Sequence, residues 1–287
     1  MIRLQKLLAG LGLGSRRTIE AWIRAGRVSL AGRTAQLGDR ASPSDDVRLD
    51  GRKLELSSSA EPAEVLLYYK PVGEVTTRRD PERRPTVFER LPPPRRGRWI
   101  SVGRLDVNTS GLLLLTTDGE LAHRLMHPSS GIEREYLVRV RGRPGPDVIE
   151  RLLAGVELED GPARFARVTA QSGHGARPAA PGNPAGGERG SHTAYRVVLH
   201  EGRRREVRRL WQAQGFEVSR LLRIRYGPIE LPRDMRPGTA RRVEPAVLAG
   251  LRAAVQRRPA GAGRIRPAQM TGHHGHPARR PPRPVSK

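Results

Sequence analysis

The chain has 287 residues, enough for one large domain or two moderate ones, and a formal net charge of +24 at pH 7. It contains no cysteine, which excludes disulfides, thiol catalysis and cysteine-based metal sites. No segment approaches the run of about 20 apolar residues that a membrane span requires, and the N-terminus lacks a signal-peptide pattern. We therefore expect a cytoplasmic protein without membrane contact.

Arginine dominates the basic residues, because only four of the 53 are lysine. Guanidinium groups bind phosphates through two parallel hydrogen bonds and stack on bases. A GC-rich genome would favour arginine codons over lysine codons, but it would not produce such an excess over the 29 acidic residues. The charge therefore predicts a nucleic-acid partner.

Residues 1–60 have the pattern of a small module of two helices and short strands. Four leucines between residues 4 and 11 recur at helical spacing, and Ser15 is placed to cap a second helix that ends at Gly26. Strands are expected at 28–30, 47–49 and 54–56, with a turn at 50–51 between the last two. The alternative for the basic residues on the helices is a solvated face, but we expect four of them to face phosphates: Arg16, Arg17, Arg24 and Arg27.

Residues 57–62 read as a linker, and residues 63–245 as a second domain rich in strands. Because the strands come in clusters and do not alternate strictly with helices, the pattern predicts an α+β fold with a mixed, mainly antiparallel sheet. The expected strands are 65–69, 112–117, 135–140, 195–200 and 218–225, and the expected helices are 120–127 and 206–214.

Two further segments have the composition of disordered chain. Residues 171–193 are rich in Gly, Pro, Ala and Ser and are expected to form a disordered insertion. Residues 246–287 contain no acidic residue and are expected to form a basic, largely disordered tail that adds non-specific RNA affinity.

Asp106 is the first candidate for chemistry. It lies in the polar segment Gly103–Gly111, with Arg104 two residues before it and an unbroken apolar run after it. The run predicts a buried strand, so Asp106 would be held on a loop by a rigid element. The sequence around it also suits an ordinary turn or helix cap, and the segment alone does not separate the two readings.

The segment Glu201–Trp211 packs five arginines at the start of a predicted helix, which is typical of an anion site. Arg208 shares a helical face with Trp211, so we expect it to point partly inward, where it needs a carboxylate partner such as Asp106. Tyr136 begins a predicted strand and either offers its ring to an extruded base or is an ordinary sheet tyrosine.

No cofactor or metal site is expected. The chain has no P-loop, and the glycines of Gly10–Gly14 follow a helix where a dinucleotide fingerprint follows a strand. The histidines of the tail, at 273, 274 and 276, have no carboxylate partners in a folded frame, so they are not expected to hold a metal.

The four segments Lys70–Gly73, Gly103–Leu115, Arg134–Tyr136 and Glu201–Trp211 together resemble the motifs of the RsuA/RluB branch of pseudouridine synthases. Residues 1–60 resemble the S4-type RNA-binding domain that this branch carries. Segments 80–88 and 219–227 resemble its large-subunit members in particular. The resemblance extends to about residue 245, interrupted by the insertion.

This resemblance implies an isomerase that converts a uridine of 23S ribosomal RNA, free or in a pre-50S particle, to pseudouridine without cofactor or metal. A monomer is expected. Asp106 would be the catalytic carboxylate, acting on C1′ or on the 2′-proton, and Arg208 would pair with it. Tyr136 would stack on the flipped base and Leu221 would close the apolar side. Four more residues are expected to bind RNA: Lys70, Arg104, Arg203 and Arg205.

Two other functions fit the sequence. One is an enzyme of the same kind that acts on small-subunit ribosomal RNA. The other is a non-catalytic RNA-binding or ribosome-assembly factor, in which Asp106 is only a turn residue.

Overall fold

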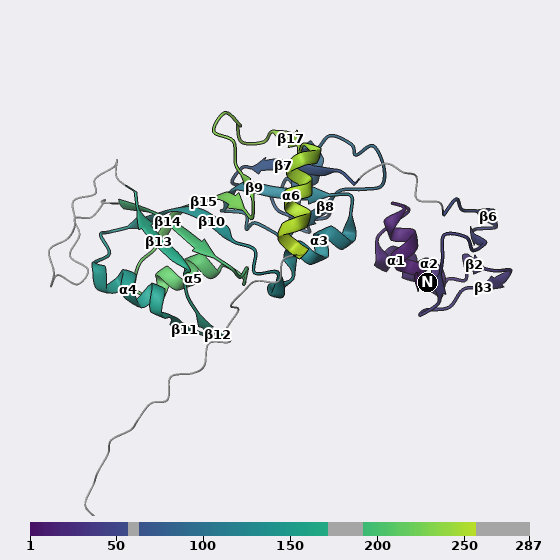
Figure 1. Cartoon of the computed structure of the whole chain (residues 1–287), viewed down its shortest axis with the longest axis horizontal. Coiled ribbons are helices and arrows are strands. Elements are labelled where there is room, and N and C mark those ends of the chain that lie inside the picture. Colours follow the sequence, from purple (N-terminus) through teal and green to yellow (C-terminus); the bar gives the residue numbers. More distant parts are fainter. Residues whose placement is uncertain (57–62, 172–191, 257–287) are drawn as a thin grey trace, which may run out of the picture.

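The computed structural model describes residues 1–56, 63–171 and 192–256. The expected linker, residues 172–191 of the expected insertion and the tail from residue 257 lie outside the described residues. The chain forms a small N-terminal module and a larger unit of two lobes, through which a single sheet runs (Figure 1). No helix in the described ranges combines the length and apolar character needed to cross a bilayer.

The N-terminal module packs two helices on short strands around its own apolar core. Ser15 caps the second helix as predicted, with its Oγ accepting the N–H of Thr18 at 2.9 Å, and Gly26 ends it with φ +68°. The bounds are β1 Ile2–Arg3, α1 Leu4–Gly10, α2 Arg16–Arg24, β2 Val28–Leu30, β3 Arg33–Thr34, β4 Arg40–Ala41, β5 Val47–Leu49 and β6 Arg52–Lys53.

The predicted turn at residues 50–51 is present, with φ +52° at Asp50 and +78° at Gly51. The strand predicted at 54–56 is wrong, because β6 covers Arg52–Lys53. A two-residue turn of this kind pairs the residues that flank it directly, so Leu49 lies opposite Arg52.

The large unit contains a nine-stranded sheet with the order β13-β14-β10-β15-β9-β7-β17, to which β16 and β8 are added at β15 and β9. All neighbours are antiparallel except β9 and β15, which confirms the mixed, mainly antiparallel α+β fold. The strands are β7 Val65–Lys70, β8 Ile100–Val102, β9 Ser110–Thr116, β10 Arg134–Arg141, β13 Arg167–Ala170, β14 His192–Leu199, β15 Val218–Tyr226, β16 Ile229–Glu230 and β17 Ala240–Arg242.

Helices cover both lobes of this unit, with α3 and α6 in the middle lobe and α4 and α5 in the outer one (Figure 1). A separate hairpin, β11–β12, lies below the outer lobe. The remaining bounds are η1 Val87–Arg90, α3 Gly119–Met126, η2 Pro128–Ser130, α4 Pro146–Ala154, β11 Val156–Leu158, β12 Gly161–Ala163, α5 Glu206–Gln212 and α6 Pro245–Gln256.

Strand β9 lies between two apolar cores, which explains its unbroken apolar sequence. Leu113 and Leu115 pack in the core shared with α5, and Leu112 and Leu114 pack in the core shared with α3 and α6. All four side chains are fully buried. A strand buried on both faces loses the alternation of polar and apolar residues that a half-exposed strand shows.

Asp118 begins α3 as its N-cap, with its carboxylate accepting the N–H of Glu120 and of Leu121. Two expectations from the sequence need correction. Strand β14 begins at residue 192, inside the range assigned to the insertion. Helix α6 occupies residues assigned to the tail, and its Leu248 and Leu251 are buried in the core of the middle lobe, so apolar burial there outweighs the basic composition.

Gly111 is required where β9 runs parallel to β15. Its φ is +109°, and a Cβ built on it would lie 2.3 Å from the carbonyl oxygen of Arg223. That approach brings the backbones of the two strands together immediately after the loop that carries Asp106.

We expect Gly111→Ala to lower the free energy of unfolding by at least about 4 kcal/mol, because the clash is with backbone and adds to the strain of the positive φ. Gly161→Ala is the matched control, since Gly161 has φ +99° but open space around it. The control should cost about 1–2 kcal/mol in the same denaturant titration. Equal losses in the two variants would contradict the close approach of β9 and β15.

Candidate active site

The segment 105–109 forms the loop that carries Asp106. Lys70 holds this loop through hydrogen bonds to its backbone. Lys70 ends β7 and is fully buried. Its Nζ donates to the carbonyl oxygens of Pro71 at 2.9 Å, Asp106 at 3.0 Å and Thr109 at 2.8 Å. The three donors of the ammonium group are therefore used on backbone.

Two further groups hold the same loop. The side-chain hydroxyl of Thr76 donates to the carbonyl oxygen of Leu105 at 3.0 Å and accepts the N–H of that residue at 3.3 Å. The N–H of Gly73 donates to the carbonyl oxygen of Val107 at 2.8 Å. No local pattern in the sequence indicates this role of Thr76, because the loop that it contacts lies 29 residues further along the chain.

Arg208, on α5, is the last of the groups that hold this loop. Its guanidinium donates from Nη2 to the carbonyl oxygen of Asn108 at 2.9 Å and from Nη1 to that of Val218 at 2.7 Å. Each of the five carbonyl groups from 105 to 109 thus accepts a hydrogen bond. The expected ion pair with Asp106 is not formed in the described structure, because the guanidinium is committed to these two backbone oxygens, although it does point inward.

The carboxylate of Asp106 is half-buried and has no hydrogen bond or ion pair to any residue in the described ranges. The cationic side chains of Lys70 and Arg208 lie near it. Burial lowers the pKa of Arg208, as does Arg205, while the charge of Asp106 raises it. Burial also lowers the pKa of Lys70 to about 8, against the charges of Glu74 and Asp106. The loop backbone is fixed and its carboxylate is free to meet a ligand.

Tyr136 and Leu221 lie on the neighbouring strands β10 and β15, where Leu221 is opposite Val138. Both are nearly buried, and they share one apolar core with Leu105, the residue before Asp106. The fold therefore brings together the three segments that carry Asp106, Tyr136 and Leu221.

Three of the residues expected to bind RNA form contacts with other residues of the protein, although only Lys70 is fully buried. Lys70 is buried, which contradicts an RNA contact. Arg203 donates to the carbonyl oxygens of residues 160, 161 and 162 and to the carboxylate of Glu201, so it fixes the turn of the β11–β12 hairpin. Arg27 forms two hydrogen bonds with Asp50 and lies over the ring of Trp22.

The other basic candidates lie on the surface. Their side chains are exposed, and none of them forms an ion pair within the part of the chain that the structure describes. They are available to a polyanion, and their contact with RNA stays a prediction. These residues are Arg16, Arg17, Arg24, Arg104 and Arg205.

Comparison with known proteins agrees with this geometry. The family model of RNA pseudouridylate synthases matches residues 64–213, and that of the S4 domain matches residues 2–47. The chain belongs to the RNA pseudouridylate synthase family and carries an N-terminal S4 domain, so it is a pseudouridine synthase, an isomerase.

Two curated relatives are named ribosomal large subunit pseudouridine synthase B. That of Yersinia pestis is 55% identical over 239 residues, which is 82% of this chain and 70% of the relative. That of Salmonella typhi is 54% identical over 239 residues, covering 82% of this chain and 77% of the relative. A crystal structure of a pseudouridylate synthase superposes with a TM-score of 0.57 at 25% identity, covering 88% of this chain and 100% of that one.

We expect Lys70→Met to reduce turnover at least tenfold and to lower the free energy of unfolding by about 1–3 kcal/mol, since two loop carbonyls lose their charged donor. Folding lowers the pKa of Lys70 from 10.5 to about 8, so the folded wild type binds fewer protons between these values. The stability of the wild type relative to the variant should therefore rise from pH about 8 to 10.5.

Chemical denaturation across this pH range and single-turnover assays measure both effects. Lys53→Met, at an exposed position of β6, is the control and should change neither. A stability difference that is independent of pH would contradict the buried, titrating ammonium.

We expect Arg208→Ala to lower kcat at least tenfold, about 1.4 kcal/mol of transition-state free energy, with a smaller change in KM. The reason is that Asn108 loses the donor that fixes the loop next to Asp106. Arg220→Ala, at an exposed position of β15, serves as the control. A rise in KM with kcat unchanged would reassign Arg208 to contact with phosphate.

Proposed function

We propose that this enzyme isomerises a uridine of large-subunit ribosomal RNA to pseudouridine with Asp106 as its catalytic carboxylate. The observation that carries the proposal is the contrast within one loop. Five successive carbonyl groups are fixed by hydrogen bonds, whereas the carboxylate of Asp106 is unpartnered among the described residues and lies near the buried ammonium of Lys70 and the half-buried guanidinium of Arg208. Such a group is held in place and still able to react.

The reaction breaks the bond between N1 of uracil and C1′ of ribose and forms a bond between C5 and C1′, while C5 loses a proton and N1 gains one. Positive character at C1′ favours a nearby carboxylate, which either attacks C1′ or removes the 2′-proton. Both routes require an ionised Asp106 at a fixed distance from the sugar.

Tyr136 and Leu221 are suited to receive the base. Reaction at C1′ and C5 requires the uridine to leave its stack, at a cost of a few kcal/mol that contacts in the protein must offset. The ring of Tyr136 offers a stacking surface, and Leu221 offers an apolar wall beside it. Both lie on strands of the central sheet, so their positions are rigid.

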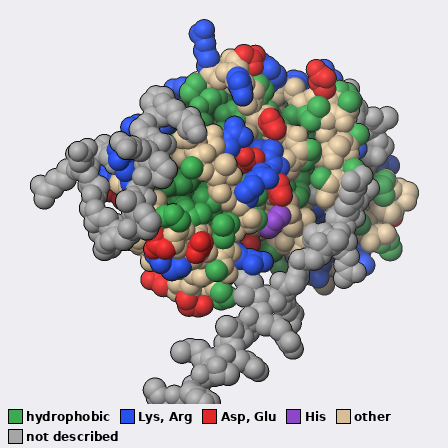
Figure 2. All heavy atoms as spheres, turned by 60° about the vertical axis from the view of Figure 1, so that its left-hand side comes forward, with side chains coloured by type: hydrophobic (Ala, Val, Ile, Leu, Met, Phe, Trp, Pro, Cys, Tyr) green, Lys and Arg blue, Asp and Glu red, His purple; other side chains and the backbone are tan. Residues whose placement is uncertain are grey.

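The large-subunit assignment follows the names of the relatives and the similarity along most of the chain. An S4 domain and exposed arginines supply sequence-independent placement on RNA. On the face shown in Figure 2, Lys and Arg side chains, with acidic side chains between them, form a band between hydrophobic areas. The second candidate substrate is small-subunit ribosomal RNA.

We expect Asp106→Asn to abolish pseudouridine formation, with at least a thousandfold loss in single-turnover rate, while RNA affinity stays within about threefold. The substitution keeps the size of the side chain and removes only its charge and basicity. Asp147→Asn is the control, because Asp147 is exposed and pairs with Arg151 on its own helix. Retained activity in the Asp106 variant would reject the assignment.

Position-resolved mapping of pseudouridine in both ribosomal RNAs, with and without the gene, identifies the substrate. Loss of one modified site in the large-subunit RNA is the expected result. Loss of a site in the small-subunit RNA would favour the second candidate, and no loss in either would refute ribosomal RNA as substrate.

A further inference from the structure

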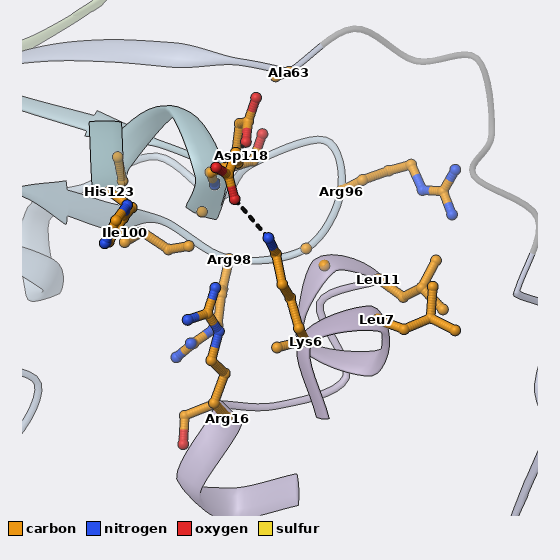
Figure 3. A pocket seen from close by; sticks show the side chains of 18 of the residues that line it. Lys6, Leu7, Leu11, Arg16, Ala63, Arg96, Arg98, Ile100, Asp118 and His123 are labelled. Atoms are coloured by element: carbon orange, nitrogen blue, oxygen red, sulfur yellow. Dashed lines mark hydrogen bonds and ion pairs between the residues drawn. The ribbon is translucent and has the colours of Figure 1, made fainter. Parts of the chain in front are cut away.

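A cavity of about 680 Å³ lies between the S4 domain and the catalytic unit. Helices α1 and α2 form one side, and the segment 95–98 with α3 forms the other (Figure 3). The volume is in the range of about 300–1,000 Å³ that holds small ligands.

Two direct contacts define the spacing of the domains at this cavity. Lys6 of α1 forms an ion pair of 2.6 Å with Glu120 of α3, which Figure 3 marks with a dashed line. The backbones of Gly12 and Gly97 meet so closely that a Cβ on Gly12 would lie 2.2 Å from the Cα of Gly97. Gly12 therefore permits a close approach between the domains that any larger residue would prevent.

The acidic residues that line the cavity are all engaged. Glu120 pairs with Lys6, Glu64 pairs with Arg242 and also accepts the N–H of residue 95, and Asp118 caps α3. None of them neutralises the remaining lining cations, so the cavity keeps an excess of positive charge.

Arg16 and Arg98 approach this space from the two domains. Figure 3 shows the side chain of Arg98 extending from the catalytic unit and that of Arg16 extending from α2 toward it. Neither has a hydrogen bond or ion pair within the described ranges, and Nε of Arg98 is buried without a partner. Burial and the guanidinium of Arg78 lower the pKa of Arg98, so its charge is poorly stabilised in the free protein.

We propose that this cavity is a second RNA-binding site, in which a backbone phosphate lies between Arg16 and Arg98 and its unpaired nucleotide lies against the apolar lining. An anion there would accept hydrogen bonds from both guanidinium groups and would satisfy the buried Nε of Arg98. The apolar side chains of Leu7, Leu11 and Ile100 supply a surface for the base.

Each domain supplies one arm of the phosphate clamp, so bound RNA would add a third contact between the domains to the two that already define their spacing. This inference rests on the proposed RNA substrate and adds a specific contact outside the active site.

The test is a double-mutant cycle with Arg16→Gln and Arg98→Gln in the full chain, measured as affinity for a large-subunit ribosomal RNA fragment against salt concentration. Each single variant should bind about five- to tenfold more weakly, with the slope of log K against log salt reduced by about one. The double variant should bind only slightly more weakly than either single variant, because each substitution removes the same shared phosphate contact.

Arg33→Gln and Arg241→Gln are matched controls, since each arginine is exposed and pairs with an acid, Asp39 and Asp234 respectively. They should keep affinity within about twofold. Additive losses in the cycle, or unchanged salt slopes, would overturn the clamp. Arg98→Lys, which keeps the charge, should keep the slope.

Cross-linking provides a second measurement that needs no charge change. The chain has no cysteine, so Met126→Cys, on the cavity wall, gives a unique thiol for a photoreactive label. RNA should cross-link there and not at Val247→Cys on α6, which is similarly exposed, at 40% against 39%. Absence of the cross-link at residue 126 would refute the site.

Wild-type turnover of the same RNA fragment, measured in parallel, reports on the proposed function by itself. If the fragment binds with the predicted cycle but is not converted, the substrate assignment fails and the cavity stands as an RNA site. If it is converted but the cycle is additive, only the cavity proposal fails.

Discussion

The active loop depends on one buried ammonium group. Among the described residues no carboxylate contacts Lys70, and its three donors all bind backbone carbonyls of its own turn and of the Asp106 loop. A desolvated cation of this kind is costly, and its depressed pKa reflects that cost. The backbone of the loop is thereby fixed without using the carboxylate of Asp106, which must remain available to the substrate. Arg208 and Thr76 act in the same way at either end.

The sheet places this loop next to the base-binding strands. The single parallel pairing, between β9 and β15, brings the start of β9 beside Leu221 and Leu222. Because Gly111 has no side chain, the two backbones approach directly after the loop. Strand β10 pairs with β15 on its other edge and presents Tyr136. The catalytic and base-stacking groups therefore come from strands far apart in the chain and share one rigid surface.

Sequence reasoning was reliable where the physics is local. The Ser15 cap, the turn at 50–51 and the buried strand after Asp106 were read from short patterns, because each depends on neighbours a few residues away. The motif resemblance identified the family for the same reason. The prediction that Lys70 binds RNA was wrong, because the sequence does not indicate whether a basic side chain binds phosphate or backbone carbonyl groups.

The amino-acid sequence by itself determined the fold class, the enzyme family and the affinity for polyanions, because these follow from periodicity, motif identity and net charge. Only the tertiary structure decided what holds Asp106. Lys70, Thr76 and Arg208 meet its loop from 29 to 100 residues away. Contacts over such distances depend on the order of the strands in the sheet and on which polar groups the fold buries away from water. No single segment of the sequence determines either of these.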